Sequence, residues 1–348
     1  MAFDCWNSAL IQVLCKPMVQ MSESHALINR ANLTVVQLDP RFTHSAQQLR
    51  DVLHSQYAAL AREEDVNSLG YMVHPNAQAI AASGQRWLAP GIDDKVRCNI
   101  LKERVALDPL DKLGMPLTLT MRLFDGGISH SHYTELLQRA PINNGADLVS
   151  GGAWLLPIDE AIAVIQAALL PVQQKQLNEL IEQGRLQLIS GSELGNFCVI
   201  SSLGAFIRLE AEYDKVDVLA LSHELGHALD LEQRWHQGSY EPIEVIEREA
   251  AAIAMEFLVL DKSQNLIHYQ NDLKRTQCRF YGPWHVALHQ FELGLYGMAH
   301  ISPKKLDRLW LVCTGSLGSR MGGWRAIQHF YTSPFYLICY PLALGCLC

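Results

Sequence analysis

The stretch LALSHELGHALD, residues 219 to 230, places two histidines four positions apart within an apolar run. On a helix, residues at this spacing share one face, so His223 and His227 can direct their ring nitrogens at a single point. Glu224 stands beside the first histidine, which completes the zinc-binding pattern H-E-x-x-H. The same pattern also describes two core histidines that are spaced this way by chance, so further residues are needed to decide.

The composition is ordinary for a globular protein with a large core. The chain has 348 residues, of which 49% are hydrophobic and 18% are charged, and its net charge is −8 at pH 7. It lacks the basic excess that binding to nucleic acid or to an anionic membrane requires. We therefore expect neither nucleic acid nor a membrane as a partner.

The cysteines and the two ends of the chain favour a cytoplasmic location. Nine cysteines are scattered along the sequence, and this odd number argues against a disulfide framework. The first twenty residues show no secretory signal, and the terminal run PFYLICYPLALGCLC is shorter than the roughly 20 residues that cross a bilayer. We expect this run to form a buried terminal helix.

Hydrophobic periodicity predicts a mainly α-helical chain with a small β-sheet, an α+β fold. Residues 1–40 show no clear period, and an amphipathic helix is predicted over 43–64. Alternating leucines predict a strand over 117–123, and a long helical pattern over 157–184 is interrupted at Pro171 and ended by Gly184. The remaining predicted strands are 185–190, 196–201 and 204–212, the last with one dry and one wet face. Further helices are predicted over 217–235, 242–261, 264–297 in pieces, 303–313 and 324–345.

A third candidate metal ligand, Glu249, follows His227 after 21 intervening residues. Three alanines come directly after it in a stretch that can be buried, and a buried carboxylate needs a partner charge such as a metal. Glu244 and Glu247 are alternatives that a solvated helix face explains better. The small Gly226 allows close packing beside the site, and Asp217 can cap the histidine helix.

Two histidines and one glutamate leave a fourth zinc position for water, which is the pattern of catalytic sites. The chemistry that this predicts is hydrolysis with one zinc ion per chain. Zinc lowers the pKa of its bound water and polarises the scissile carbonyl, while Glu224 accepts the proton and passes it to the leaving amine.

Several segments between about 155 and 345 resemble, in order, motifs of the thimet oligopeptidase and oligoendopeptidase F family of zinc peptidases. IEREAAAIAMEF is similar to the family helix A-E-x-x-S-x-x-x-E, and RFYGPWHVALHQFELGLY to a family helix ending in Phe-Glu. WRAIQHFYTSPFYLICYPLALG is similar to the signature W-x-x-I-x-H-F-x-x-x-P-F-Y-x-x-x-Y, and AFIRLEAEYDKVDVLALSHELGHALD to the substrate-edge strand and zinc helix. The resemblance implies a zincin-like catalytic domain.

The resemblance also implies residue roles. Glu249 would be the zinc ligand and Glu256 a residue that supports the ligands from behind. His329, Tyr336 and Tyr340 would approach the substrate and the oxyanion, where hydrogen-bond donors are needed. The alternative is that His329 and Tyr336 are core groups of a long apolar helix. An extended peptide would pair with an exposed strand through the backbone of four residues: Gly204, Ala205, Phe206 and Ile207.

The sequence departs from the family pattern at several positions. Ile338 stands where many relatives have a tyrosine, which leaves open which phenol stabilises the oxyanion. Ala252 replaces a serine, Asp230 stands where a histidine often follows, and the chain is shorter than the family's usual length. Four other histidines are expected to be structural or exposed: His236, His268, His285 and His289.

We expect three parts: an unassigned segment 1–40, an N-terminal helical lobe with short strands over 41–150, and a catalytic domain over 151–348. The leading hypothesis is a zinc metallopeptidase that hydrolyses short, unstructured peptides. One alternative is a dedicated processing protease for a single precursor peptide or partner protein. The other is a peptide-binding protein that keeps the fold without turnover, against which the intact Glu224 argues.

Overall fold

The computed structural model describes eleven stretches of the chain, and all structural statements below refer to them. They are residues 36–37, 92–125, 128–139, 154–190, 196–201, 204–212, 215–236, 245–263, 267–315, 323–327 and 329–347. The helix predicted over 43–64 and nearly all of the segment 1–40 lie outside these residues.

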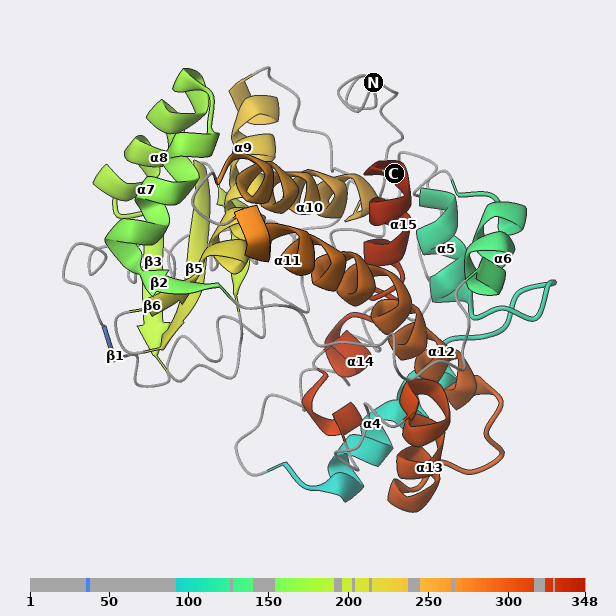
Figure 1. The fold of residues 1–348 in the computed structure, drawn as a ribbon. Coiled ribbons are helices and arrows are strands. Elements are labelled where there is room, and N and C mark those ends of the chain that lie inside the picture. Colours follow the sequence, from blue (N-terminus) through green and yellow to red (C-terminus); the bar gives the residue numbers. More distant parts are fainter. Residues whose placement is uncertain are drawn as a thin grey trace.

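Most of the described chain is helical, as the sequence predicts (Figure 1). Around the histidine motif the helices are α7 (Ile158–Ala168), α8 (Pro171–Glu182), α9 (Val218–His236), α10 (Val245–Lys262) and α11 (Ile267–Arg279). A π-helical turn, η6 (Phe280–Trp284), joins α11 to α12 (His285–Tyr296). The others are α4 (Asp94–Leu107), α5 (Leu117–Asp125), α6 (His130–Arg139), α13 (Pro303–Thr314), the 3-10 turn η8 (Gly323–Ala326), α14 (His329–Thr332) and α15 (Cys339–Leu347).

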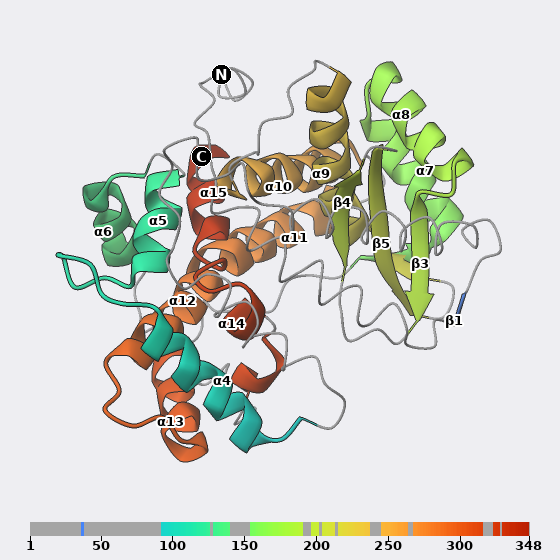
Figure 2. The same cartoon turned by 180° about the vertical axis from the view of Figure 1, so that it is seen from behind.

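One six-stranded sheet lies at one end of the molecule, in the order β1-β3-β5-β6-β2, with β4 paired to β5. Its strands are β1 (Val36–Gln37), β2 (Leu155–Pro157), β3 (Leu186–Ser190), β4 (Phe197–Ser201), β5 (Gly204–Glu212) and β6 (Lys215–Asp217). β3 runs parallel to β5, whereas β4 runs antiparallel to it on the other side. Figure 2 shows β4, β5 and β3 side by side, with β4 on the side of α10 and α11.

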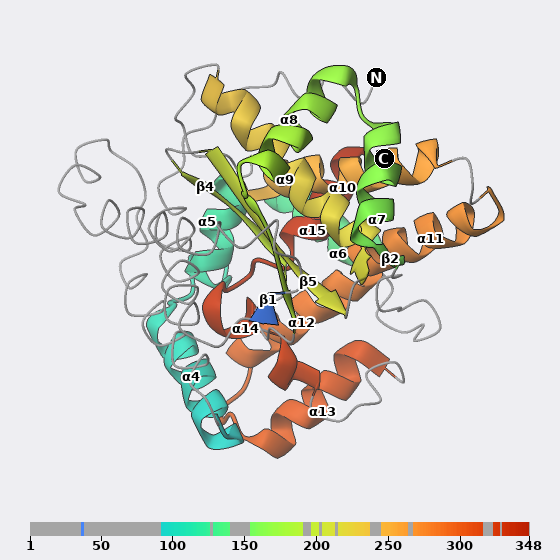
Figure 3. The ribbon, with the colours of Figure 1, turned by 90° about the vertical axis from the view of Figure 1, so that its left-hand side faces the viewer.

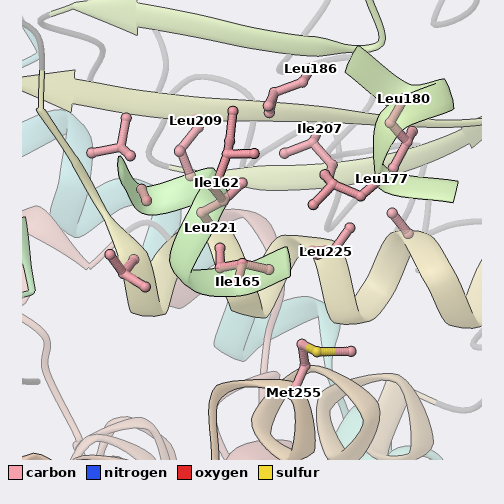
Figure 4. Packing of buried hydrophobic residues seen from close by; sticks show 14 of the residues in the cluster. Ile162, Ile165, Leu177, Leu180, Leu186, Ile207, Leu209, Leu221, Leu225 and Met255 are labelled. Carbon is pink, nitrogen blue, oxygen red and sulfur yellow. The ribbon is translucent and has the colours of Figure 1, made fainter. Parts of the chain in front are cut away.

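A hydrophobic core lies between this sheet and α9, with α7 and α8 closing it (Figure 4). Leu186, Ile207 and Leu209 of the strands face Leu221 and Leu225 of α9, and all five are buried. The long helical pattern breaks at Pro171, where α8 begins, and ends before Gly184, whose φ of 65° favours glycine. The sheet and α7 to α9 therefore form a rigid support for the histidine motif.

Two further cores join the N-terminal helices to the C-terminal ones. In the first, α4 packs with α12, α13 and α14, as Leu101, Phe291 and Phe330 show. In the second, α5 and α6 pack with α10 and α15, as Leu119 and Leu342 show. The described part of the predicted N-terminal lobe thus shares its cores with the predicted catalytic domain. Figure 3 shows α4 and α13 together, at the end of the molecule away from α7 and α8.

The strand predicted over 117–123 is wrong, because this segment forms helix α5. Leu119 and Leu123 are buried, and their spacing of four residues satisfies a helix as well as a strand. The helix begins after Pro116, and its first turn is capped by Asp108 Oδ1, which accepts the Thr118 N–H at 2.9 Å. A capping residue ten positions earlier leaves no local signal in the sequence.

The continuous helix predicted over 324–345 is also wrong. Only η8, α14 and α15 are helical in this range, and turns lie between α14 and α15. Pro334 disfavours helical geometry at the residue before it, and Phe335 has a φ of 57°. Within the described residues, no helix is both long and apolar enough to cross a membrane.

Candidate metal centre

Helices α9 and α10 bring the predicted ligands together because they pack unusually closely. A Cβ atom on Gly226 would lie 2.7 Å from the Ala252 Cα and 2.9 Å from the Ala251 carbonyl oxygen. Asp217 Oδ1 accepts the Leu219 N–H at 3.0 Å at the start of α9, which is the capping role that the sequence predicts. The cap and the close contact fix α9 relative to α10.

His223, His227 and Glu249 converge at this contact. Their potential ligand atoms all lie within 4.8 Å of one another. His223 Nε2 is 3.3 Å from Glu249 Oε2, and His227 Nε2 is 3.7 Å from Glu249 Oε1. Ligand atoms about 2.0–2.1 Å from a tetrahedral zinc ion would be about 3.3 Å apart. The spacing therefore matches that of ligands to one shared cation.

The chemistry of the three residues also fits a divalent cation. Glu249 is 1% exposed, and its Oε2 atom is buried without a well-aligned hydrogen bond among the described residues, with His223 Nε2 3.3 Å away. A buried carboxylate oxygen in this state calls for a compensating positive charge. Burial lowers the pKa of His227 to about 3, so its imidazole is neutral, the form that binds metals. Two histidines and one glutamate favour zinc.

Glu256 follows Glu249 by about two helical turns on α10. Its carboxylate is hydrogen-bonded to the His223 ring nitrogen that faces away from Glu249. Its Oε1 atom lies 2.7 Å from His223 Nδ1, and the Tyr281 hydroxyl donates to the same oxygen. Gln277 Nε2 donates to Glu256 Oε2 at 2.6 Å. With Nδ1 engaged, His223 has Nε2 left to present to the metal position, and a hydrogen bond at the second ring nitrogen is typical of metal-ligating histidines.

Sequence reasoning missed Gln277 and Tyr281. They lie four residues apart on α11 and η6, so they share a face, and both are buried. Their spacing is visible in the sequence, but nothing there links them to Glu256. The one available signal is Pro283 in a helical pattern, because a π-helical turn often marks a functional site.

Glu224 lies on α9 next to the first histidine and is 6% exposed. Burial raises the pKa of its carboxyl group to about 7. A carboxyl group that titrates near neutral pH can both accept and return a proton. The position and the pKa of Glu224 therefore suit a general base.

The structure brings His329, Tyr336 and Tyr340 close to the candidate metal ligands. The Tyr336 hydroxyl donates to Glu249 Oε1, and the His329 ring stacks on the Tyr336 ring with their centres 4.7 Å apart. The Tyr340 ring centre lies 6.4 Å from that of His223 and 5.8 Å from that of Tyr336. Ile338 is fully buried in a hydrophobic core.

The expectation that Gly204 to Ile207 forms an exposed edge is wrong. β4 pairs with this part of β5, opposing Val199 to Phe206 and Ile200 to Ala205. On the other side, Arg185 donates to the Ala205 carbonyl oxygen at 2.9 Å. The expected wet face is wrong for Phe206 and Arg208, which are buried, whereas Glu210 is exposed as expected. In the described part of the sheet, β4 pairs only with β5 and so forms the edge.

The other histidines differ in their surroundings. His285 is buried, with its ring centre 4.4 Å from that of Tyr340. His289 is fully buried and its Nε2 atom is hydrogen-bonded to the Tyr133 hydroxyl at 2.8 Å. His289 thus lies within the core, whereas His285 packs against Tyr340 beside the candidate metal ligands. The side chains of His236 and His268 lie outside the described part of the chain. Glu247 is half-buried on α10, and Glu244 is not described.

Comparison with solved structures finds a similar fold in PZ peptidase A, solved with an inhibitor. The TM-score is 0.54 at 14% sequence identity, and the match covers 96% of this chain and 63% of that chain. A protein of Bacillus anthracis str. Ames, assigned as an oligoendopeptidase F, matches with a TM-score of 0.41 at 16% identity, covering 95% of this chain and 62% of that one. No model of a known protein family matches the sequence, and no curated protein does.

The likeness to PZ peptidase A shows that the two chains share a fold. The chain has the mostly helical architecture, with one small sheet, of PZ peptidase A. It spans about 63% of the length of that peptidase chain. Within the shared fold, the described residues contain a His/His/Glu cluster that could hold a metal ion.

Proposed function

We propose that the protein is a zinc-dependent metallopeptidase that hydrolyses peptide bonds in short, unstructured peptides. The observation that carries this proposal is the convergence of His223, His227 and Glu249, with Glu224 beside the first histidine. The fold shared with a peptidase supports it. One zinc ion held by these three residues would supply a Lewis acid that activates water and polarises the scissile carbonyl.

The protein's own residues supply the remaining steps. Glu224 accepts a proton from the attacking water and returns it to the leaving amine, which its pKa of about 7 permits near neutral pH. Tyr336, Tyr340 and His329 lie around the metal ligands and would donate hydrogen bonds to the oxyanion that develops on the carbonyl, Tyr336 by turning the hydroxyl that donates to Glu249 Oε1 in this structure. Glu256 keeps His223 oriented.

The peptide substrate is assigned to β4 rather than to β5. β4 is one of the edge strands of the described sheet, and it packs against α9. An extended peptide that pairs with an edge strand gains main-chain hydrogen bonds without a sequence requirement. This mode suits a peptidase that accepts many short peptides.

Digestion of a mixed peptide pool, read by mass spectrometry, tests the proposal. The zinc-loaded protein should cut peptides, and Glu224→Gln should lower the rate by about 100- to 10,000-fold because the base is lost. Glu182→Gln, an exposed glutamate on α8, is the matched control and should keep full activity. If cleavage is absent or insensitive to Glu224→Gln, the proposal fails.

The same digestion separates the alternatives. Tight peptide binding without any products would favour a binding protein. Cleavage of one precursor while the mixed pool stays intact would favour a dedicated processing protease.

A further inference from the structure

The turn between α14 and α15 carries Tyr336 and has a strained backbone. Phe335 has a φ of 57°, and it is the one non-glycine residue with positive φ among the described residues. This backbone conformation is unfavourable for a residue with a side chain, so the surrounding structure must hold it. Residues 333–336 are called the Tyr336 turn below.

Three charged side chains from other helices form hydrogen bonds with the main chain of this turn and of α14, which precedes it. Glu292 Oε1 accepts the Phe335 N–H at 2.9 Å. Arg122 Nε donates to the Pro334 carbonyl oxygen at 2.7 Å, and Arg104 Nη1 donates to the Phe330 carbonyl oxygen at 2.7 Å. These bonds join the turn to α12 and α5, and they join α14 to α4. The three helices lie far from the turn in the sequence.

Two of these three side chains, Arg104 and Glu292, are buried and contact each other, and Arg122 is half-buried. Arg104 and Glu292 are 1% and 0% exposed and form an ion pair with Nη2 and Oε1 2.8 Å apart. The Arg104 guanidinium carbon lies 4.9 Å from the Phe335 ring centre, which holds the strained residue from its side-chain end. A buried ion pair adds little net stability compared with apolar residues, so stability alone is a weak reason for it.

The position of the Tyr336 ring depends on this turn. The Arg122 guanidinium carbon lies 5.5 Å from the Tyr336 ring centre, and the Tyr336 hydroxyl donates to Glu249 Oε1. A shift of about 1 Å in a group that meets the reacting atoms can cost on the order of 100-fold in rate. Small movements of the turn would therefore reach the metal cluster.

We propose that Arg104, Arg122 and Glu292 are positioning residues, which hold the Tyr336 turn in its strained conformation so that the Tyr336 hydroxyl stays at the His223, His227 and Glu249 cluster. The inference rests on the proposed function, because it assigns Tyr336 a task in peptide hydrolysis. It makes α4, α5 and α12 part of the catalytic apparatus although none of the three residues touches the metal ligands. It also explains why a phenylalanine with positive φ is retained beside Tyr336.

Steady-state kinetics on a peptide that the wild type cuts tests this with Arg122→Met, which keeps an unbranched apolar stem but removes the charge and the hydrogen-bond donors. We expect kcat to fall about 10- to 100-fold with KM within about twofold, and Arg122→Lys to recover part of the loss. The double variant Arg104→Met with Glu292→Leu removes both members of the buried pair at once, which avoids leaving one charge unpaired. Arg325→Met, at a half-buried arginine that pairs with Asp94 and Asp307, is the matched control.

A double-mutant cycle with Tyr336→Phe shows whether the effect passes through Tyr336. If it does, Arg122→Met should cost little further activity in the Tyr336→Phe background. Two further measurements on the variants are the amount of zinc bound per chain and the affinity for a phosphinic peptide that mimics the tetrahedral state. Zinc content should stay at the wild-type level while the affinity for this inhibitor falls by about the same factor as kcat.

An equal loss of kcat in both backgrounds, or unchanged kcat in Arg122→Met, would overturn the inference and leave the proposed function standing. A wild-type protein that binds zinc but cuts no peptide would overturn the proposed function, and the inference with it.

Discussion

Gly226 is the residue that most directly sets the distance between the two ligand-bearing helices. Its Cα faces the backbone of α10, with Ala252 Cα, Ala251 O and Met255 Cβ at 2.7, 2.9 and 3.0 Å from the position that a Cβ atom would take. Two of these atoms belong to the backbone and cannot rotate away. A side chain here would therefore push α9 from α10 and separate the histidines from Glu249.

Gly226→Ala should destabilise the protein by about 1–3 kcal/mol, because overpacking at a helix contact forces the backbone to move. Gly345→Ala on α15 is the matched control, since no atom lies within 4 Å of the position that its Cβ would take. This control should be neutral or stabilising by up to about 1 kcal/mol. Urea unfolding of both metal-free variants gives the comparison, and equal midpoints would contradict the close contact.

At the scale of elements, η6 and the end of α11 act as a support for the metal centre. Gln277 and Tyr281 both donate to Glu256, and Glu256 in turn holds His223 Nδ1. All three supporting residues are buried. The orientation of the first histidine thus depends on a helix that contributes no ligand.

Tyr281→Phe and Gln277→Leu should each weaken zinc binding by about 10-fold or more, because residues behind the ligands typically carry effects of 10- to 100-fold. Competition with a chromophoric chelator measures this affinity without any need for activity. Tyr331→Phe is the matched control, because the Tyr331 hydroxyl donates to the Trp324 carbonyl oxygen at 3.2 Å, in another core. Wild-type affinity in both test variants would show that Glu256 needs no such support.

Elements whose ends carry local signals could be predicted from the sequence. Pro171 and Gly184 mark the boundaries of α8, and Asp217 marks the start of α9. Elements whose limits depend on distant contacts could not. Helix α5 needs the cap from Asp108, and the break after α14 is stabilised by Glu292. Strand order is also non-local, so the sequence predicts β5 at an edge that β4 occupies.

At the scale of the whole molecule, the site residues also divide into those with a local signal in the sequence and those that depend on distant contacts. His223, Glu224 and His227 follow from one helical spacing, and Glu249 from a carboxylate among alanines. Arg104, Arg122, Gln277 and Tyr281 could not be found this way, because each matters through a partner that is distant in the chain. Their sequence neighbourhoods are those of ordinary helices, and only the packing of α4, α5 and α11 against the C-terminal helices reveals them.

The packing of α6 against α12 makes stability depend on pH through His289. Burial, followed by the nearby Arg104 charge, lowers the pKa of this histidine to about 3, whereas an unfolded histidine titrates near 6.5. Between these values the unfolded chain binds a proton that the folded protein does not. The contribution to stability is therefore complete above pH 6.5 and is lost as the pH falls toward 3.

His289→Gln can keep a hydrogen bond to Tyr133 but has no proton to gain. Relative to this variant, the wild type should lose about 1–2 kcal/mol of unfolding free energy between pH 7 and pH 5. Urea unfolding at the two pH values measures the difference. His132→Gln on the exposed side of α6 serves as the control and should track the wild type. Parallel pH dependence of wild type and His289→Gln would mean that His289 takes up its proton in the folded state.

Metal binding should stabilise the entire molecule, because the ligands on α9 and α10 join the sheet core to the helical cores. Zinc at 100 times its Kd should raise the unfolding free energy by about 2.7 kcal/mol, provided that the unfolded chain does not bind it. Thermal unfolding with added zinc and with a chelator measures this stabilisation as a difference in Tm. Glu249→Gln should abolish the shift, whereas Glu247→Gln, at the half-buried glutamate on the same helix, should retain it. A shift that survives Glu249→Gln but not Glu247→Gln would move the third ligand to Glu247 and break the geometry on which the proposed hydrolysis depends.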